Sequence, residues 1–205
     1  NIITTYCPNT GSLKGMLNEK ARVLVAKVDN PKAKLKYRLE AIKHNGVYVG
    51  INTSLPNGII YEAIKEKKIL NHLQGEIKTE VKYGKNSRVD IFIDNPKGKN
   101  CFIEVKSVTL SRLKGLSEFP DAKTTRGSKH LIELAEMSKQ GNECYLVYLI
   151  QRKDVEMFSI AKDIDEEYYK NSIIAKNNGV KFIAFSCKVS KKGINVIQQV
   201  EINEN

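Results

Sequence analysis

The hydrophobic pattern divides the chain into two parts with different periods. Up to about residue 52, the pattern is that of short strands and loops, and its apolar residues recur at every second position where a strand has one buried face. The strands predicted there cover residues 21–28, 35–43 and 46–51. The second strand alternates most regularly. Its positively charged side chains, which point away from the apolar ones, are Lys32, Lys34, Lys36 and Arg38. We therefore expect one edge of a small β-barrel with a basic face.

After a turn at residues 55–58 the spacing becomes helical. Apolar residues between 59 and 68 fall on one side of a helix. Thr124 and Thr125 are good N-cap residues for a second helix, which ends at Gly141. The other predicted elements, in chain order, are strands at 75–83, 87–93, 101–105 and 144–151, a helix at 165–178 and a strand at 180–188. This order of helices and strands predicts an α/β domain over residues 55–205.

Composition narrows the class of protein. Apolar residues make up 41% and charged residues 28% of the 205 residues, which is ordinary for a globular chain and excludes a disordered one. The longest clean apolar run, residues 145–150, is far short of the roughly 18 residues of a membrane span. The four cysteines lie far apart without a CxxC pair. We therefore expect reduced, buried thiols in a cytoplasmic protein rather than a zinc site.

The chain is strongly basic, with 34 Lys+Arg against 23 Asp+Glu and a net charge of +11. Such a surface attracts polyanions, so nucleic acid is the expected partner, and a membrane is not. A second explanation stays open, because the excess is mostly lysine and asparagine is also abundant, as the codon usage of an AT-rich genome produces. The sequence leaves a homodimer open.

The segment with candidate chemistry is a predicted hairpin made of residues 87–93 and 101–105. If its apolar faces align, even-numbered residues pair with even-numbered ones, and Asp90 lies opposite Glu104 or Lys106, with Cβ atoms about 5 Å apart. Two carboxylates that close repel one another unless a cation lies between them. Mg²⁺ or Mn²⁺ would supply that charge, with Asp90, Glu104 and the Val105 carbonyl as ligands.

A lysine beside such an ion suggests hydrolysis. Lys106 would orient or polarise the water that attacks a phosphodiester, while the ion stabilises the oxyanion. The alternative is a surface hairpin in which Arg88, Asp90, Glu104 and Lys106 only form cross-strand ion pairs. Spacing alone does not separate these two interpretations.

Asp90 with the run Glu104-Val105-Lys106 resembles the PD-(D/E)xK nuclease core. The surrounding sequence is similar to one family with this core, the sugar fermentation stimulation protein A (SfsA) family. The stretches that carry the resemblance are CPNTGS at 7–12, DNPK at 29–32, VGINT at 49–53, EVKYG at 80–84, FPDA at 119–122, TRGSKHL at 125–131 and QR at 151–152. They span nearly the whole chain in one order.

The resemblance implies an α+β protein with two domains. An OB-like β-barrel would occupy residues 1–54, and a nuclease-like domain with a mixed sheet flanked by helices would occupy residues 55–205. Only part of the family's first barrel strands precede the CPNTGS stretch, so we expect an incomplete barrel. The resemblance also implies sequence-non-specific DNA binding tied to sugar metabolism, especially that of maltose.

Several further residues have two interpretations. Glu62, on the helix before the predicted hairpin, is either an extra catalytic acid or a solvated glutamate. Asp121 is either a third metal ligand or an ordinary loop acid. Arg126, Lys129 and His130 follow a helix start and would contact DNA phosphate there, although a lone helical histidine is more often structural.

Two functions therefore remain open on the sequence. The first is DNA binding through backbone contacts, with Lys32, Lys34, Lys36 and Arg38 on the contact face. The second is a divalent-metal nuclease that cuts DNA or RNA, with Asp90, Glu104, Lys106 and Glu62 as its catalytic residues. A regulator that reads specific bases is a third class, but the sequence has no convincing helix-turn-helix or zinc finger.

Overall fold

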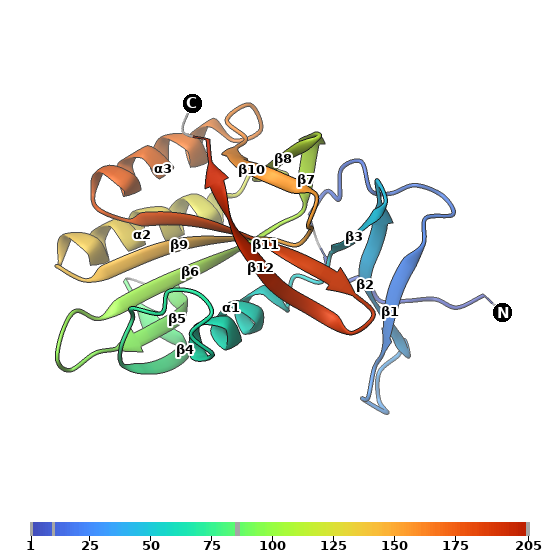
Figure 1. Ribbon diagram of the computed structural model, residues 1–205, viewed down its shortest axis with the longest axis horizontal. Helices are drawn as coiled ribbons and strands as arrows, with labels where there is room; N and C mark the ends of the chain where they lie inside the picture. Colours follow the sequence, from blue (N-terminus) through green and yellow to red (C-terminus); the bar gives the residue numbers. More distant parts are fainter. Residues whose placement is uncertain (1, 10, 85–86, 204–205) are drawn as a thin grey trace.

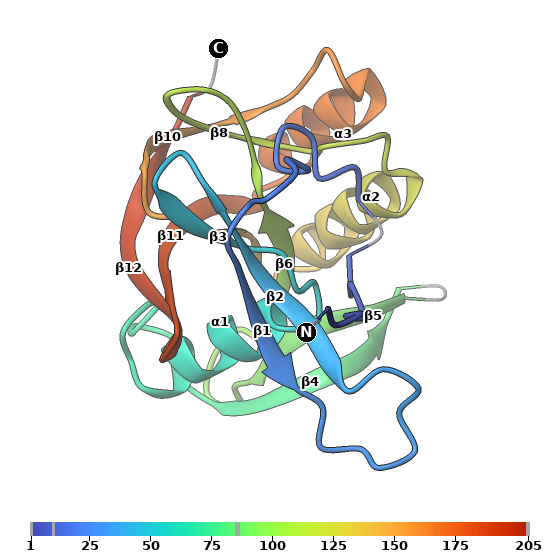
Figure 2. The same ribbon diagram turned by 90° about the vertical axis from the view of Figure 1, so that its right-hand side faces the viewer.

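The structure, a computed structural model, describes residues 2–9, 11–84 and 87–203. Its N-terminal part is a three-stranded antiparallel sheet in the order β1-β2-β3. The strands are β1 (Val23–Lys27), β2 (Tyr37–His44) and β3 (Val47–Gly50). This sheet has a small core of its own, which contains Ile42, Val49 and Ile51. In Figure 1 it lies at the right-hand end of the molecule, in blue, and in Figure 2 it faces the viewer.

The rest of the described chain forms one mixed sheet of nine strands with three helices. The strand order is β4-β5-β6-β9-β11-β12-β10-β8-β7. The elements are α1 (Pro56–Lys65), β4 (Glu76–Tyr83), β5 (Ser87–Asp94), β6 (Cys101–Val108), β7 (Leu110–Leu113), β8 (Gly115–Phe119), α2 (Thr125–Lys139), β9 (Glu143–Ile150), β10 (Val155–Ile160), α3 (Glu166–Asn177), β11 (Lys181–Ser190) and β12 (Gly193–Ile202). The fold is therefore α+β, as the resemblance implied.

Helices cover both faces of this sheet, and strand alternation decides which residues each helix contacts. On β6, the odd-numbered Ile103 packs in one core with Ile60 and Ile64 of α1. The even-numbered Phe102 packs in the other core with Leu131 of α2. Figure 1 shows α2 and α3 side by side on their face and α1 apart from them. Even-numbered side chains of β6 therefore point toward α2.

Hydrogen bonds join the N-terminal sheet to the large sheet. The N–H of Gly50 donates to the Gln151 carbonyl at 2.9 Å. A Cβ at Gly50 would lie 2.6 Å from Gln151 Oε1, so a larger residue there would displace the Gln151 side chain. The N–H of Ser12 donates to Asp121 Oδ2 at 3.0 Å, and its hydroxyl donates to the Asp121 carbonyl at 3.2 Å. The start of the chain is thus fixed to the loop before α2.

The strand predicted over residues 35–43 is confirmed in part, but its predicted basic face, from Lys32 to Arg38, is mostly outside it. The structure begins β2 at Tyr37 and places Lys32, Lys34 and Lys36 in the turns and bends before it. The N–H of Val28 donates to the Lys36 carbonyl, so the chain between them is a loop outside the ladder. The three lysines are exposed, as the alternation predicted. Arg38 lies in β2 and pairs with Glu40 at 2.6 Å.

The remaining expectations from composition can be checked directly. All four cysteines are free, and Cys101, Cys144 and Cys187 are buried, as predicted. In the described ranges, no helix is long and apolar enough to cross a membrane.

Candidate metal centre

The hairpin of β5 and β6 brings two carboxylates together. Its register pairs Ile91 with Ile103 and Phe92 with Phe102, which confirms the even-to-even pairing, and one further step sets Asp90 opposite Glu104. The ladder stops before that step, since the Val105 N–H donates to Asp90 Oδ2 at 2.7 Å instead of to a backbone carbonyl of β5.

A residue outside the hairpin also holds Asp90. Asn57 Nδ2, in the first turn of α1, donates to Asp90 Oδ1 at 2.7 Å. Asn57 was not among the residues predicted from the sequence. It follows Pro56, which starts the helix, but an asparagine in a helix's first turn gives no sign of a partner 33 residues away.

Glu104 is 2% exposed and points toward α2. Its Oε1 accepts a hydrogen bond from Lys106 Nζ at 2.9 Å and contacts His130 Nδ1. Burial opposes its ionisation, but the charges and hydrogen bonds of Lys106 and His130 outweigh burial and hold the pKa of Glu104 below its usual range. Its other oxygen, Oε2, is buried and has no hydrogen-bond partner in the protein.

Asp90 has the opposite electrostatic balance. Burial and, after it, the charge of Glu104 raise the pKa of Asp90 to about 6. The hydrogen bonds from Val105 and Asn57 and the charge of Lys106 lower it by less. The carboxylate pair is therefore short of positive charge, although Lys106 is close by.

Two of the three predicted phosphate-contacting residues of α2 join this cluster. His130 is buried, with Nδ1 3.3 Å from Lys106 Nζ. Arg126 Nε lies 3.4 Å from the other ring nitrogen, Nε2. Both come from the start of α2, where the Thr124 hydroxyl accepts from the Gly127 N–H and caps the helix. Lys129 lies apart from them and is 3.6 Å from Glu133.

The structure does not bring Glu62 and Asp121 into the cluster. Glu62 is exposed on α1 and lines a surface groove with Gly58 and Ile194. It is five residues after Asn57, so it points about 140° away around the helix. Asp121 binds Ser12, as described above. Their catalytic and ligand roles therefore lack support in the geometry.

The remaining residues fit a divalent ion that keeps several waters. Among the described residues, no group of three or more His, Cys, Asp and Glu side chains is arranged to hold a metal. Mg²⁺ commonly binds through one or two carboxylates, with water and substrate phosphate as its other ligands. Asp90 and the unpartnered Oε2 of Glu104 match that requirement with hard oxygen donors. The Val105 carbonyl stays a predicted ligand.

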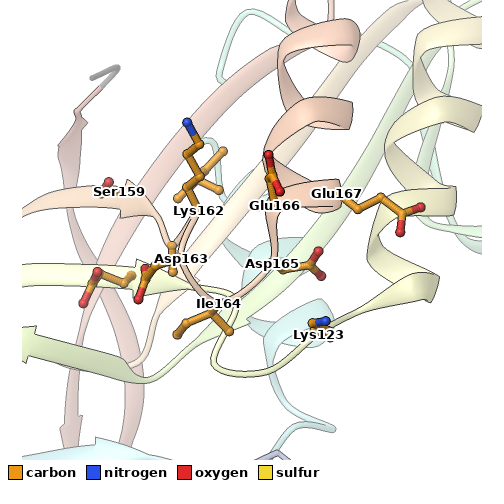
Figure 3. Close-up of a pocket in the computed structure, with 11 residues that line it drawn as sticks. Lys123, Ser159, Lys162, Asp163, Ile164, Asp165, Glu166 and Glu167 are labelled. Carbon is orange, nitrogen blue, oxygen red and sulfur yellow. The ribbon is translucent and has the colours of Figure 1, made fainter.

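A second acid-rich region lies elsewhere in the fold. It is a surface hollow of about 900 Å³ between β8, β10 and the start of α3 (Figure 3). Its acids include Glu118, Asp163, Asp165 and Glu166. It shares no residue with the Asp90–Glu104 pair.

Taken together, an N-terminal antiparallel sheet joined to a mixed sheet that carries the buried Glu104 opposite the half-buried Asp90 defines a two-domain α+β protein with a candidate metal centre. The family model described as "Sugar fermentation stimulation protein RE domain" matches residues 54–193, and that of the "SfsA N-terminal OB domain" matches residues 1–51. The chain therefore belongs to the sugar fermentation stimulation protein (SfsA) family, as the sequence motifs predicted. Its N-terminal sheet is an OB domain.

Similar proteins agree with this assignment. The chain is 47% identical to the sugar fermentation stimulation protein homolog of Pelagibacter ubique, over 98% of this chain and 87% of that protein. It is 40% identical to the homolog of Bartonella henselae, over 98% and 86% of the two chains. A solved structure described as Pyrococcus furiosus SfsA in complex with Ca²⁺ matches with a TM-score of 0.87 and 26% identity, covering 99% of this chain and 87% of that one.

Proposed function

We propose that this protein is a divalent-metal-dependent nuclease that binds DNA without sequence preference. The observation that carries the proposal is the buried Oε2 of Glu104, which has no partner and belongs to a carboxylate opposite Asp90. A buried anionic oxygen is costly unless a cation or a donor reaches it. The solved structure of Pyrococcus furiosus SfsA is a complex with Ca²⁺, which supports an ion in this family.

Each residue of the cluster has a role in this proposal. Asp90 and Glu104 hold the ion, while Asn57 and the Val105 N–H keep the Asp90 carboxylate in place. When bound, the ion would neutralise charge that develops on the phosphate and lower the pKa of the attacking water. Lys106 keeps a positive charge beside the reacting groups, close to Glu104.

Contact with DNA would depend on charge rather than on base recognition. The net charge of +11 favours the phosphate backbone. Lys32, Lys34 and Lys36 are exposed and can follow it, whereas Arg38 already pairs with Glu40. Arg126, which lies beside His130, would extend the positively charged surface that contacts the DNA backbone to the Asp90–Glu104 pair.

A second candidate is a DNA-binding protein that does not cleave. It is favoured by the fact that Lys106 and His130 already compensate one oxygen of Glu104. The names of the relatives connect the family to sugar fermentation. In this form the protein would regulate sugar metabolism, that of maltose included, through non-specific DNA binding.

One assay separates the two candidates. Labelled single- and double-stranded DNA of two unrelated sequences is incubated with the protein in Mg²⁺, Mn²⁺ or EDTA, and both mobility shift and cleavage are scored. A nuclease cleaves both sequences only with metal, and its affinity for both falls steeply with salt. Binding without cleavage in every condition supports the second candidate. Salt-insensitive binding, or strong preference for one sequence, contradicts both.

The variant Lys106→Ala tests the role of Lys106 in the same assay. We expect this variant to lose cleavage by about 100-fold or more, because a positioned charge beside the reacting atoms is gone. Its Mn²⁺ affinity, measured by titration calorimetry, should stay equal or rise slightly, since one neighbouring cation is removed. Lys139→Ala is the matched control, because Lys139 lies on the surface of α2 and pairs with Glu136 at 2.7 Å, away from the acid pair.

A further inference from the structure

Unpartnered buried polar atoms gather beside the candidate metal centre. In the described part of the chain, five buried side-chain atoms have no hydrogen-bond partner, namely Tyr83 Oη, Glu104 Oε2, Ser128 Oγ, Glu133 Oε2 and Gln151 Oε1. Tyr83 is 7% exposed and the Glu133 side chain 13%. Because native proteins leave few such atoms, each group of them needs a physical explanation.

Three of these atoms, Tyr83 Oη, Glu104 Oε2 and Glu133 Oε2, belong to residues that lie next to one another in the fold. Glu133 follows His130 by three residues, so it lies on the same side of α2, next to the histidine that contacts Glu104. The end of β4 contacts the Glu133 side chain from its other side, since a Cβ at Gly84 would lie 3.0 Å from Glu133 Oε1. The Tyr83 ring, at the end of the same strand, packs against Phe102, two residues before Glu104, with ring centroids 5.8 Å apart.

The pKa of Tyr83 also reflects the three nearby carboxylates. Burial raises the pKa of Tyr83 well above its usual value, and the charges of Glu104, Glu133 and Asp90 raise it further. Its hydroxyl therefore keeps its proton and lies in the field of all three carboxylates. It is a hydrogen-bond donor among acceptors.

The cluster lacks donors and positive charge. The nearest cation to Glu133 is Lys129, whose Nζ is 3.6 Å from Oε1 and whose side chain is 48% exposed. The Oε2 atoms of Glu104 and Glu133 are both acceptors, and Tyr83 has one hydrogen to donate. One hydrogen does not satisfy two carboxylate oxygens. A hydrated cation would bring both charge and further hydrogens.

Glu133 does not reach such an ion as a direct third ligand. No group of three His, Cys, Asp or Glu side chains within the described ranges is close enough for that. An acid just outside the direct ligands can accept hydrogen bonds from the waters that the ion binds. Carboxylates that ligate a metal commonly accept a further hydrogen bond from an outer residue.

We propose that Glu133 and Tyr83 are the positioning residues of this centre. Glu133 Oε2 accepts a hydrogen bond from a water in the hydration shell of the divalent ion that Asp90 and Glu104 hold. The Tyr83 hydroxyl donates to a bridging water that in turn donates to Glu104 Oε2, since the two side chains form no direct hydrogen bond, and this contact fixes the orientation of the carboxylate. This assignment rests on the proposed metal-dependent function, but it concerns the affinity and surroundings of the ion rather than the reaction.

The test compares the whole chain with Glu133→Gln and Tyr83→Phe by Mn²⁺ titration calorimetry. We expect each variant to bind Mn²⁺ about tenfold more weakly, the range found for residues that hold a metal's outer surroundings. Glu136→Gln is the matched control, because Glu136 lies three residues further along α2 and pairs with Lys139 on the surface. Its Mn²⁺ affinity should equal that of the unmodified protein.

Thermal unfolding in EDTA separates positioning from a structural role. Both substitutions change a buried atom that has no hydrogen-bond partner, and the ion pair that Glu133→Gln loses is to the half-exposed Lys129, so the metal-free melting temperature should hold or rise. A lower melting temperature in EDTA with unchanged Mn²⁺ affinity would mean that the two side chains stabilise the fold, and would overturn the assignment.

The parent protein provides the remaining distinction. If it binds Mn²⁺ and both variants match it, the positioning role is wrong and the proposed centre stands. If the parent binds no Mn²⁺, the proposed centre fails and the positioning role fails with it.

Discussion

Two acid-rich regions of this protein differ in how their carboxylates are neutralised. Two acids that line the hollow of Figure 3 bind Arg112, Glu118 at 2.6 Å and Asp163 at 2.5 Å. Asp165 caps α3 by accepting from the Tyr168 N–H at 3.0 Å. Under α2, by contrast, Glu104 keeps one buried oxygen without a partner.

The pKa values of Asp163 and Asp90 move in opposite directions for this reason. The hydrogen bonds and charge of Arg112 hold the pKa of Asp163 below its usual range. Burial and the charge of Glu104 raise the pKa of Asp90 to about 6. The number of acids is thus a poor indicator of a metal site. Buried acids whose charge the protein leaves partly uncompensated are a better one.

The largest expected effect comes from removing one acid of the buried pair. Asp90→Ala should lose Mn²⁺ affinity by about 100-fold or more, together with all cleavage, because a direct ligand is gone. Its DNA affinity in EDTA should hold or rise, since a carboxylate that repels phosphate has been removed. Calorimetry and gel shift measure the two quantities.

Asp163→Ala is the control for this comparison, because it removes an acid of the hollow and should change neither quantity. If folded Asp90→Ala bound DNA much more weakly than the parent, Asp90 would contact the nucleic acid itself. The assignment of the hairpin as a metal centre would then be wrong.

The next effect is a pH dependence that only the buried pair should show. Because folding raises the Asp90 pKa from 3.8 to about 6, the folded state binds more protons than the unfolded state between these values. Metal-free stability should therefore fall as pH rises toward 6, by about 3 kcal/mol in all. Asp90→Asn lacks this slope and should be more stable than the parent above pH 6.

Urea unfolding in EDTA at several values from pH 5 to 8 measures the part of this difference that remains above pH 5, about 1.4 kcal/mol. The lowered pKa of Glu104 does not interfere, since its contribution is complete above its usual value of 4.5. Asp163→Asn should follow the parent across the same range, because the lowered pKa of Asp163 confines its titration to more acidic conditions. Equal slopes in the parent and Asp90→Asn would contradict the raised pKa. Mn²⁺ affinity of the parent should also weaken below pH 6, where the proton competes with the ion.

The acid pair was predictable because a strand has a period of two. Once the apolar faces of β5 and β6 are aligned, Asp90 must lie across from Glu104 or Lys106 whatever the rest of the fold does, and the observed register selects Glu104. Asn57 and Glu133 reach the same place from two helices, and no local pattern connects a helix position to a strand partner. Glu62 has the right charge on the right helix but the wrong side of it.

The missed and misplaced strands have related causes. β12 (Gly193–Ile202) is largely exposed, so its apolar residues do not mark a buried face. β7 and β8 have four and five residues, too few for a periodic signal. The lysines before β2 alternate in exposure without belonging to a ladder, because alternation reports which side chains face water and not which backbone groups are paired.

The smallest effect should come from Arg112→Ala, which removes the cation shared by two acids of the hollow, Glu118 and Asp163. The Arg112 side chain is 39% exposed, so solvent already screens the pairs and we expect a loss of about 1 kcal/mol in unfolding free energy. Most of it would come from Glu118, which is 8% exposed and loses the guanidinium that neutralises it. The double variant Arg112→Ala/Glu118→Gln should recover part of the loss. Mn²⁺ affinity and DNA affinity should match the parent in both variants, because the hollow shares no residue with the metal centre. A change in either affinity would mean that the two acid-rich regions act on each other.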